Sequence, residues 1–392
     1  MYEAQRLQQA TEVITSYKFE QPFIQHLKAF FKANKKLGSR DRRQLSELVY
    51  DYYRVGLAVP TDDITNRICI GHFLRNTIDT FFSSYISTLY PTITSEEFGL
   101  SISEKEKLIQ KVYPDFSLQN IFPSEIEFSK HSDKDIQNQS ILTPSITWIR
   151  AKQKHLDEII VELNNAEIEF KQSEQSKFAI GFQKKTDFSK LKSFDNGFFE
   201  IQDLSSQLCV NKMSVIDEHY WWDVCSGSGG KALLIMDQVN DIHMTLSDNR
   251  KSILRNLEKR FKKAKIEADV IFELDATNKD DINALNQEFD RIMVDVPCTG
   301  SGTWVRNPEQ ILAFDKSILE EHNKNQKIIL KNALTKLKKG GELYYMTCSV
   351  FKAENEDVLD AIGGSFKVKA EEMIDCTSNR GDNLFISIIS HI

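Results

Sequence analysis

The stretch YWWDVCSGSGGKALL, residues 220–234, carries the strongest signal for the fold class. A strand-like apolar run ends at Asp223, a glycine-rich turn follows, and helical apolar spacing resumes after Lys231. Five further strand candidates follow: IHMTLSD (242–248), ADVIFELD (268–275), DRIMVDVP (290–297), GELYYMTCS (341–349) and NLFISIIS (383–390). Helical patterns separate the first five of the six candidates. This alternation predicts an α/β fold with a doubly wound, mainly parallel, Rossmann-like sheet, whose ligands bind at the carboxyl ends of the strands.

The region before this sheet divides into two parts. Residues 1–140 show helical spacing throughout, and in LGSRDRRQLSELVYDYYR (37–54) Ser39 is the expected N-cap. The polar segment 128–145 predicts a boundary, and short strand-like and helix-like pieces follow it. We therefore expect an all-α domain at 1–140, a small α+β domain at 145–215 and the sheet domain at 216–392.

The composition is that of a globular protein, with 392 residues of which 41% are hydrophobic and 27% charged. No apolar run approaches the roughly 18–20 residues of a membrane span, and the first residues do not form a secretory signal. The six cysteines are scattered without zinc-like spacing. We expect a cytoplasmic monomer with free thiols, no metal site and no membrane partner.

The net charge of −7 argues mildly against a nucleic-acid partner, but binding needs only a local basic face. Two helical segments offer one: KSILRNLEKRFKKAK (251–265), with seven basic residues and one Glu, and KNQKIILKNALTKLKKG (324–340), with six Lys and no acid. Each is either an RNA-contacting surface or the solvated face of an amphipathic helix.

The glycine turn suggests a nucleotide-like cofactor. Gly227, Gly229 and Ala232 fit the dinucleotide pattern G-x-G-x-x-A, whereas the pattern of a P-loop is absent. Asp248 ends the second strand candidate, 25 residues after Asp223, where it could accept hydrogen bonds from ribose hydroxyls. That placement serves NAD and S-adenosylmethionine equally, so the turn leaves both cofactors open.

Four successive strand candidates each carry an aspartate at the carboxyl end, namely Asp223, Asp248, Asp275 and Asp295. Any one of them could be a helix N-cap. Together they predict a pocket lined with carboxylates, which would repel a pyrophosphate and attract the sulfonium and amino groups of S-adenosylmethionine. The residues therefore favour the methyl donor over NAD, and an NAD-dependent oxidoreductase remains the weaker alternative.

Two cysteines also stand at strand ends, Cys298 after the fourth strand candidate and Cys348 after the fifth. Neighbouring strands of a sheet lie about 5 Å apart, so both turns can face one pocket. A small buried thiol is the ordinary alternative, and we accept it for Cys69, Cys209 and Cys376.

Several pieces of the chain match one family in sequence: GFFEIQDLSSQ (197–207), DVCSGSGGK (223–231), LSDN (246–249), LDAT (274–277), VDVPCTGSGTWVRNPE (294–309), GGELYYMTCSVFKAENE (340–356) and GDNLFIS (381–387). With them the chain resembles the RNA (cytosine-5) methyltransferases of the Nop/Sun (RsmB-like) family, which include bacterial ribosomal RNA methylases. The helical N-terminus resembles the NusB-like RNA-binding domain of some bacterial members. The resemblance implies an enzyme that methylates carbon 5 of a cytosine in RNA, with rRNA favoured over tRNA.

The resemblance also implies roles for single residues. Cys348 would add to carbon 6 of the cytosine, and the helix expected near Glu354 would favour its thiolate. Asp295 would contact the ring as an acid, and Cys298 would release the product. The implied cofactor set is Cys225, Ser226, Gly227, Ser228, Gly229, Gly230, Lys231, Asp248, Asp275 and Asp295.

The chain departs from the family in the glycine turn, where Ser226, Gly227 and Ser228 replace the usual Ala-Ala-Pro. We expect a looser turn there, and the departure motivates an alternative function, an RNA-binding ribosome-assembly factor with impaired catalysis. Trp304 either stacks on the unstacked base or serves packing alone.

Overall fold

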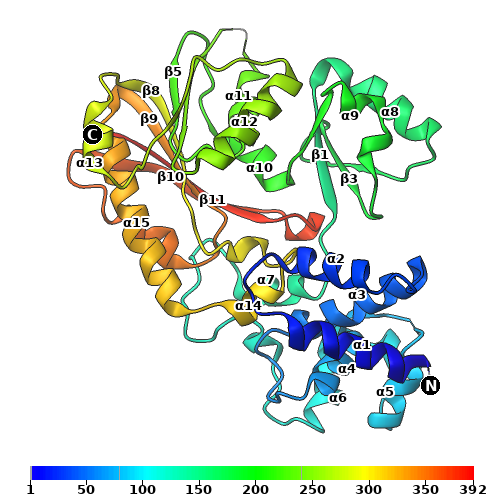
Figure 1. Cartoon of the computed structure of the whole chain (residues 1–392). Helices are drawn as coiled ribbons and strands as arrows, with labels where there is room; N and C mark the ends of the chain where they lie inside the picture. The colour runs from blue at the N-terminus through cyan, green and yellow to red at the C-terminus, as the bar shows by residue number, and fades with distance from the viewer. Residues whose placement is uncertain (1, 79, 240) are drawn as a thin grey trace. The chain divides into compact units, whose positions relative to one another are not determined.

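The computed structural model describes residues 2–78, 80–239 and 241–392 (Figure 1). The chain divides into two compact units. The helical unit comprises residues 1–126, 133–144 and 304–314, and the sheet unit comprises residues 127–132, 145–303 and 315–392. Segment 304–314 therefore packs with helices that precede it by more than 150 residues in sequence. Among the described residues, no helix is long and apolar enough to span a lipid bilayer.

The helical unit confirms the prediction of helices over the N-terminal region. Its core includes Leu45, Leu48, Val49 and Tyr53, all on one helix and all buried. The α-helices are α1 (Tyr2–Ser16), α2 (Phe23–Ala33), α3 (Ser39–Arg54), α4 (Ile64–Arg75), α5 (Ser83–Leu89), α6 (Ile102–Gln110), α7 (Lys134–Ile141) and α14 (Glu309–Ala313).

One local expectation for this unit is wrong. Ser39 is the first residue of α3 and Gly38 is its N-cap, because the carboxylate of Asp41 accepts the Gly38 N–H at 3.2 Å and supplies the capping contact. In the polar segment 128–145, the chain passes from the helical unit to the sheet unit between residues 144 and 145, and the segment also contains α7. Its Asn138 is buried and accepts the Phe122 N–H at 3.1 Å. Polar residues here serve internal hydrogen bonds, which composition alone does not distinguish from a loop.

A buried charge network joins α3 to α4 in the helical unit. Asp51 is fully buried, and its two carboxylate oxygens lie 2.6 Å from His72 Nδ1 and 2.5 Å from Arg75 Nε. Burial by itself would raise the pKa of Asp51, but the nearby Arg75 and His72 outweigh burial and hold it below its ordinary value. His72 Nε2 in turn lies 2.7 Å from the hydroxyl of Thr80.

The sheet unit begins with a four-stranded sheet of order β2-β3-β1-β4, in which all neighbouring pairs are antiparallel. Its core is formed by apolar residues such as Ile149, Ile180 and Phe199, packed against Ile159 and Leu163 of α8. The elements are β1 (Thr147–Ala151), α8 (Leu156–Asn165), β2 (Lys171–Gln172), β3 (Ala179–Phe182), α9 (Lys192–Asp195), β4 (Phe199–Ile201) and α10 (Leu204–Leu208).

The seven-stranded sheet confirms the predicted Rossmann-like class. Its order is β10-β11-β9-β8-β5-β6-β7, with parallel pairs from β9 to β7 and antiparallel pairs at β9–β11 and β11–β10. The chain adds β6 and β7 on one side of β5, and then β8 and β9 on the other, so the switch point lies between β5 and β8. The strands are β5 (Tyr220–Asp223), β6 (His243–Asp248), β7 (Val270–Glu273), β8 (Phe289–Asp295), β9 (Leu337–Thr347), β10 (Phe366–Asp375) and β11 (Asn383–His391).

Helices cover both faces of this sheet (Figure 1). One core joins the sheet to α11 (Gly230–Met236) and α12 (Lys251–Ala264) through residues such as Leu233, Leu257 and Phe261. The other core joins it to α13 (Lys279–Ala284), α15 (Lys316–Leu334) and α16 (Glu356–Leu359). Because α15 ends at Leu334, the predicted helix over 324–340 is too long, and residues from Leu337 onward belong to β9.

Candidate active site

The candidate residues meet at the carboxyl edge of the seven-stranded sheet. Asp223, Asp248 and Asp295 are the last residues of β5, β6 and β8, and Cys348 follows β9 directly. β7 ends at Glu273, so Asp275 lies two residues beyond the strand that it was expected to end. This edge includes the switch point, where ligands of such sheets bind.

The glycine turn after β5 adopts a conformation that suits glycine. Gly227 and Gly229 have φ of +52° and +75°, in the left-handed region. A Cβ on Gly229 would meet the Phe261 ring at 2.5 Å, whereas a Cβ on Gly227 would meet nothing within 4 Å. The turn therefore packs closely against α12 at Gly229, whereas the space next to Gly227 is open. The Gly227 N–H donates to Asp248 Oδ2 at 3.0 Å.

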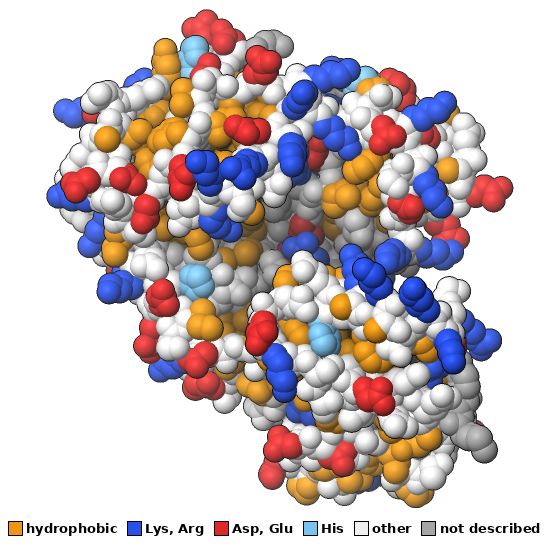
Figure 2. All heavy atoms as spheres, viewed as in Figure 1, with side chains coloured by type: hydrophobic (Ala, Val, Ile, Leu, Met, Phe, Trp, Pro, Cys, Tyr) orange, Lys and Arg blue, Asp and Glu red, His pale blue; other side chains and the backbone are white. Residues whose placement is uncertain are grey.

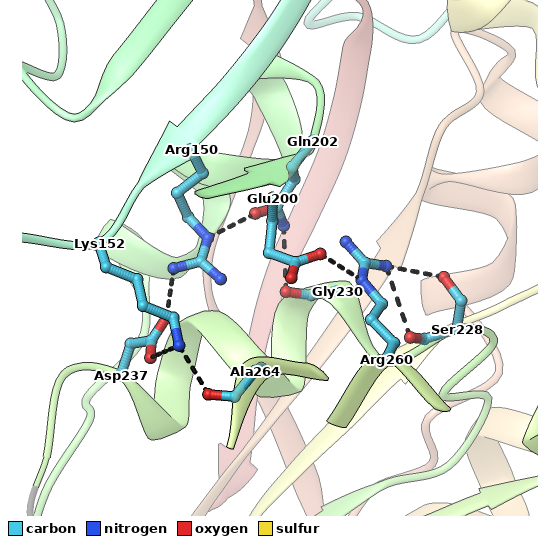
Figure 3. Close-up of polar contacts among 9 residues, drawn as sticks. All are labelled: Arg150, Lys152, Glu200, Gln202, Ser228, Gly230, Asp237, Arg260 and Ala264. Carbon is cyan, nitrogen blue, oxygen red and sulfur yellow. Dashed lines mark hydrogen bonds and ion pairs between the residues drawn. The ribbon is translucent and has the colours of Figure 1, made fainter. Parts of the chain in front are cut away.

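Side chains from β4 and α12 hold this turn from outside (Figure 3). Arg260 Nη1 donates to the Ser228 hydroxyl at 2.9 Å, and Arg260 Nε donates to Glu200 Oε2 at 2.6 Å. Gln202 Nε2 donates to the Gly230 carbonyl at 3.2 Å. Ser228 stands where the resembling family has proline, and its hydroxyl gives the turn an anchor that a proline cannot form.

Asp223 and Asp248 lie in different electrostatic environments. Asp223 is buried, and its Oδ1 has no hydrogen-bond partner within the described ranges. Burial, and secondarily the charge of Asp295, raises the pKa of Asp223 to about 8. Burial also acts on Asp248, but the hydrogen bonds from Arg250 and the Gly227 N–H hold its pKa below the ordinary value. Arg250 Nε and Nη2 donate to Asp248 at 2.9 and 3.0 Å, so this side chain must move before a ligand hydroxyl can replace it.

Asp295 forms an ion pair with Lys231 of the glycine turn. The two side chains meet at 2.6 Å between Nζ and Oδ2. Burial alone would lower the pKa of Lys231, but the charge of Asp295 outweighs burial and raises it. The Asp295 side chain is 33% exposed, so it remains open to a ligand while paired.

The two strand-end cysteines lie in contact, with 3.3 Å between Cys298 Sγ and Cys348 Sγ. Both are half-buried and neither forms a disulfide. The hydrogen bond with Cys348, followed by burial, raises the pKa of Cys298 well above its ordinary value. Cys298 therefore keeps its proton at neutral pH, and either sulfur of the pair can be the donor in the contact.

Glu354 anchors the loop that carries Cys298. Its fully buried carboxylate accepts the Thr299 N–H at 2.8 Å, the Thr299 hydroxyl at 2.5 Å and Gln326 Nε2 at 3.1 Å. The Gly302 N–H donates to the Cys348 carbonyl at 2.9 Å and ties the two cysteine loops together. No role for Glu354 or Gln326 was predicted from the sequence, although Glu354 lies in the TCSVFKAENE motif.

The helix expected to favour the Cys348 thiolate is too short for that role. A single turn, Lys352–Glu354, precedes α16, which has only four residues. A macrodipole needs aligned peptides over several turns, so its effect on the thiol is small. The closest polar neighbour of the Cys348 thiol is instead the sulfur of Cys298, at 3.3 Å.

The remaining candidates divide between the site edge and the core. Cys225 is half-buried directly after β5, and Asp275 is exposed and accepts the Thr277 N–H and hydroxyl. Trp304 is buried in the helical unit and stacks on Phe122 with 5.1 Å between ring centroids, so it serves packing and is not a platform for a base. The remaining thiols are buried as expected: Cys69, Cys209 and Cys376. Across the described residues, no cluster of three His, Cys, Asp or Glu side chains could hold a metal ion.

Part of the chain, including this site, is similar to known proteins. Residues 211–383 match the model of the family described as 16S rRNA methyltransferase RsmB/F. Ribosomal RNA small subunit methyltransferase B of Yersinia enterocolitica is 29% identical over 211 residues, covering 53% of this chain and 49% of the relative. The same protein of Vibrio vulnificus is 29% identical over 224 residues, with 55% and 50% covered. The chain thus spans about half the length of these curated relatives.

Solved structures share the fold. The crystal structure of PH0851 aligns with a TM-score of 0.69 at 19% identity, covering 94% of this chain and 95% of the other. A methyltransferase homolog protein from Pyrococcus horikoshii aligns with a TM-score of 0.57 at 21% identity, covering 75% and 100%. At these identities the likeness establishes the fold alone. The alignment with PH0851 extends over nearly the whole chain.

Proposed function

We propose, from the RsmB/F methyltransferase domain at residues 211–383, that this chain transfers a methyl group from S-adenosylmethionine to carbon 5 of a cytosine in RNA. The observation that carries the proposal is the contact of two thiols, 3.3 Å apart, beside the Lys231–Asp295 pair. A pyrimidine has to be activated at carbon 6 before carbon 5 can accept a methyl group. A nucleophilic thiol and a second thiol that later removes a proton are suited to those two tasks.

The residues at the carboxyl edge fit the proposed methyl donor. The open space above Gly227 admits a ligand against the backbone, and the orphaned Oδ1 of buried Asp223 is an acceptor suited to an amino group. Asp248 would accept ribose hydroxyls once Arg250 withdraws. The donor would be held by Cys225 to Lys231 with Asp248, Asp275 and Asp295, and it would supply the methyl group.

Cys348 is the nucleophile in this proposal. A thiolate at Cys348 would accept a hydrogen bond from the protonated Cys298, whose sulfur lies 3.3 Å away, and this bond would stabilise the charge. Addition forms a bond between sulfur and carbon 6. Asp295 contacts the N3 edge of the ring, where a proton is gained as electron density moves toward carbon 5. Lys231 keeps Asp295 in position for this contact.

Cys298 completes the reaction. Once Cys348 is bonded to carbon, it is no longer the anionic partner that raises the pKa of Cys298. Cys298 then ionises more readily, at the stage at which a base is needed. It takes the carbon 5 proton, the bond between carbon 6 and Cys348 breaks, and N3 returns its proton. The ring becomes aromatic again and Cys348 is regenerated.

Ribosomal RNA is the substrate that we favour. The relatives from Yersinia enterocolitica and Vibrio vulnificus are named for the small ribosomal subunit. The sequence of the helical N-terminus also resembles NusB-like RNA-binding domains. We therefore favour rRNA over tRNA, acted on by a cytoplasmic monomer. A duplex would have to release the cytosine from its stack before the base could reach two thiols at the end of a sheet.

The direct test is nucleoside mass spectrometry after incubation with S-adenosylmethionine and either small-subunit rRNA or tRNA transcripts. We expect 5-methylcytidine in the rRNA sample with the wild-type chain and none with Cys348→Ala. Cys69→Ala removes a buried thiol of the helical unit and serves as the matched control, which should methylate as the wild type does. RNA binding without any 5-methylcytidine would favour the assembly factor, and methylation of tRNA alone would reverse our choice of substrate.

A further inference from the structure

A groove opens between the four-stranded sheet and the far ends of two helices of the larger sheet, all within the sheet unit. It has a volume of about 800 Å³ and is lined by residues that follow β1, by Phe198 and by the C-terminal ends of α11 and α12. Three cations border it, Lys152, Lys154 and Lys265. α11 and α12 begin at the cofactor edge of the sheet and end at the groove, so the groove lies at the opposite end of these helices from the proposed active site. None of the residues that line the groove takes part in the proposed chemistry.

The one carboxylate in the groove is already neutralised (Figure 3). Asp237 is paired with Arg150 at 2.5 Å and with Lys152 at 3.9 Å. Lys152 Nζ also donates to the Ala264 carbonyl at 2.8 Å, at the end of α12. Lys154 and Lys265 are exposed and make no ion pair with the described residues. The groove is therefore net positive.

An aromatic pair lies beside these cations. The rings of His155 and Phe198 stack with 3.6 Å between centroids and 9° between planes. Flat rings next to cations are the combination with which proteins bind single-stranded nucleic acid, because every base has a face to stack and every nucleotide carries a phosphate.

A basic stripe leads from the cofactor edge toward this groove. We define it as Lys251, Arg255, Lys259 and Lys262, which are spaced four, four and three residues apart on α12 and are all exposed. This spacing puts them on one side of the helix, and at 1.5 Å per residue they extend over about 16 Å. Within the described chain none of the four is ion-paired. Glu258, the single acid of the helix, lies on the same side, three residues after Arg255 and four before Lys262. Figure 2 shows Lys and Arg side chains gathered over this region.

The other basic segment, on α15, differs in its surroundings. On α15, Glu320 and Glu321 lie between Lys316 and Lys324. Beyond the helix, Lys336 donates to the Leu285 carbonyl and Lys338 pairs with Asp290 at 2.8 Å. The two segments look alike in sequence, but the cations of α12 lead to the groove, where Lys265 follows the last residue of the helix.

We propose that the basic stripe and the groove together form a second RNA-binding surface, which holds the phosphate backbone of the substrate outside the catalytic pocket. This inference rests on the proposed function for its choice of RNA. Contacts to phosphate fix the position of a strand without reading its sequence, so the surface would contribute affinity and direction, and the thiol pocket would select the base.

The test compares two triple variants of equal charge change. Arg255→Gln, Lys259→Gln and Lys262→Gln remove three of the four cations of the stripe, whereas Lys316→Gln, Lys324→Gln and Lys331→Gln remove three exposed lysines of α15 as the control. Binding of a 30-nucleotide single-stranded RNA is measured by fluorescence anisotropy over a range of salt. Three lost phosphate contacts should make the slope of log K against log salt shallower by about 2, and should weaken binding about tenfold or more at 150 mM salt. The control should bind within twofold of the wild type.

Two further measurements complete the test. Lys154→Gln with Lys265→Gln should reduce the salt slope by about 1.4. Calorimetric titration with S-adenosylmethionine should give the same Kd for all variants, because none touches the proposed cofactor residues. RNA binding by the stripe variant as tight as that of the wild type, or an equal loss of affinity in the α15 control, would contradict the proposed RNA-binding surface. Failure of the wild-type chain to methylate RNA, with the binding pattern intact, would instead remove the proposed activity and leave the surface standing.

Discussion

Replacement of Glu354 by alanine should loosen the loop that carries Cys298. The change removes three hydrogen bonds to a buried carboxylate, two from Thr299 and one from Gln326. Hydrogen bonds to a charged group contribute about 1.5–3 kcal/mol each, which gives roughly 4.5–9 kcal/mol for the three. Loss of the buried charge offsets several kcal/mol of this sum. We therefore expect the free energy of unfolding to fall by about 3 kcal/mol.

The assay is urea denaturation followed by circular dichroism, with the m-value as a check on two-state behaviour. Glu354→Gln keeps the shape of the side chain and one carbonyl oxygen, so its free energy of unfolding should fall by about half as much. Glu372 is the control, because it pairs with Lys212 at the surface with 43% of its side chain exposed, and Glu372→Gln should change the free energy by less than about 0.5 kcal/mol. A loss below about 1 kcal/mol for Glu354→Ala would show that the carboxylate does not hold the loop.

Three other variants test separate parts of the structure. Asp223 has a pKa raised to about 8 by burial, so the folded chain binds a proton that the unfolded chain has released. The free energy of unfolding should consequently fall by about 1.4 kcal/mol for each unit of rise in pH between pH 5 and 7.5, and Asp223→Asn should abolish this slope. Parallel profiles of unfolding free energy against pH for the wild type and the variant would contradict the raised pKa of Asp223. Arg260→Met removes the anchor of Ser228 and should raise the calorimetric Kd for S-adenosylmethionine about tenfold while kcat at saturating cofactor stays within twofold; an unchanged Kd would exclude the anchoring role. Asp51→Asn breaks the buried contacts with His72 and Arg75 and should cost about 3 kcal/mol in urea denaturation, and a cost below about 1 kcal/mol would refute their importance.

The sequence predicts the sheet well where apolar strands alternate with helices. β10 was not predicted from the sequence. A charged pattern does not predict a strand, and its residues include Lys367, Lys369, Glu371 and Glu372. The sheet order explains that composition. β10 is an edge strand, and charged side chains are a common means of keeping an exposed edge from pairing with another chain.

The meeting of Cys298 and Cys348 could be predicted because carboxyl ends of adjacent parallel strands share one edge. The contacts around them could not. Glu354 reaches Thr299 across 55 residues, and the Trp304–Phe122 stack joins positions that no local pattern relates. Arg250 folds back on Asp248 only through its side-chain conformation. Such contacts depend on tertiary packing and on rotamers, which spacing along the chain does not specify.

The most direct test of the central claim is whether Cys348 becomes bonded to the base and Cys298 frees it. The measurement is denaturing electrophoresis, with mass spectrometry of any shifted band, after incubation of Cys298→Ala with RNA and S-adenosylmethionine. We predict an RNA–protein complex that resists SDS, with the crosslink at Cys348, and none with the double variant Cys298→Ala, Cys348→Ala. A complex that persists in the double variant, or full methylation by Cys348→Ala, would contradict the account.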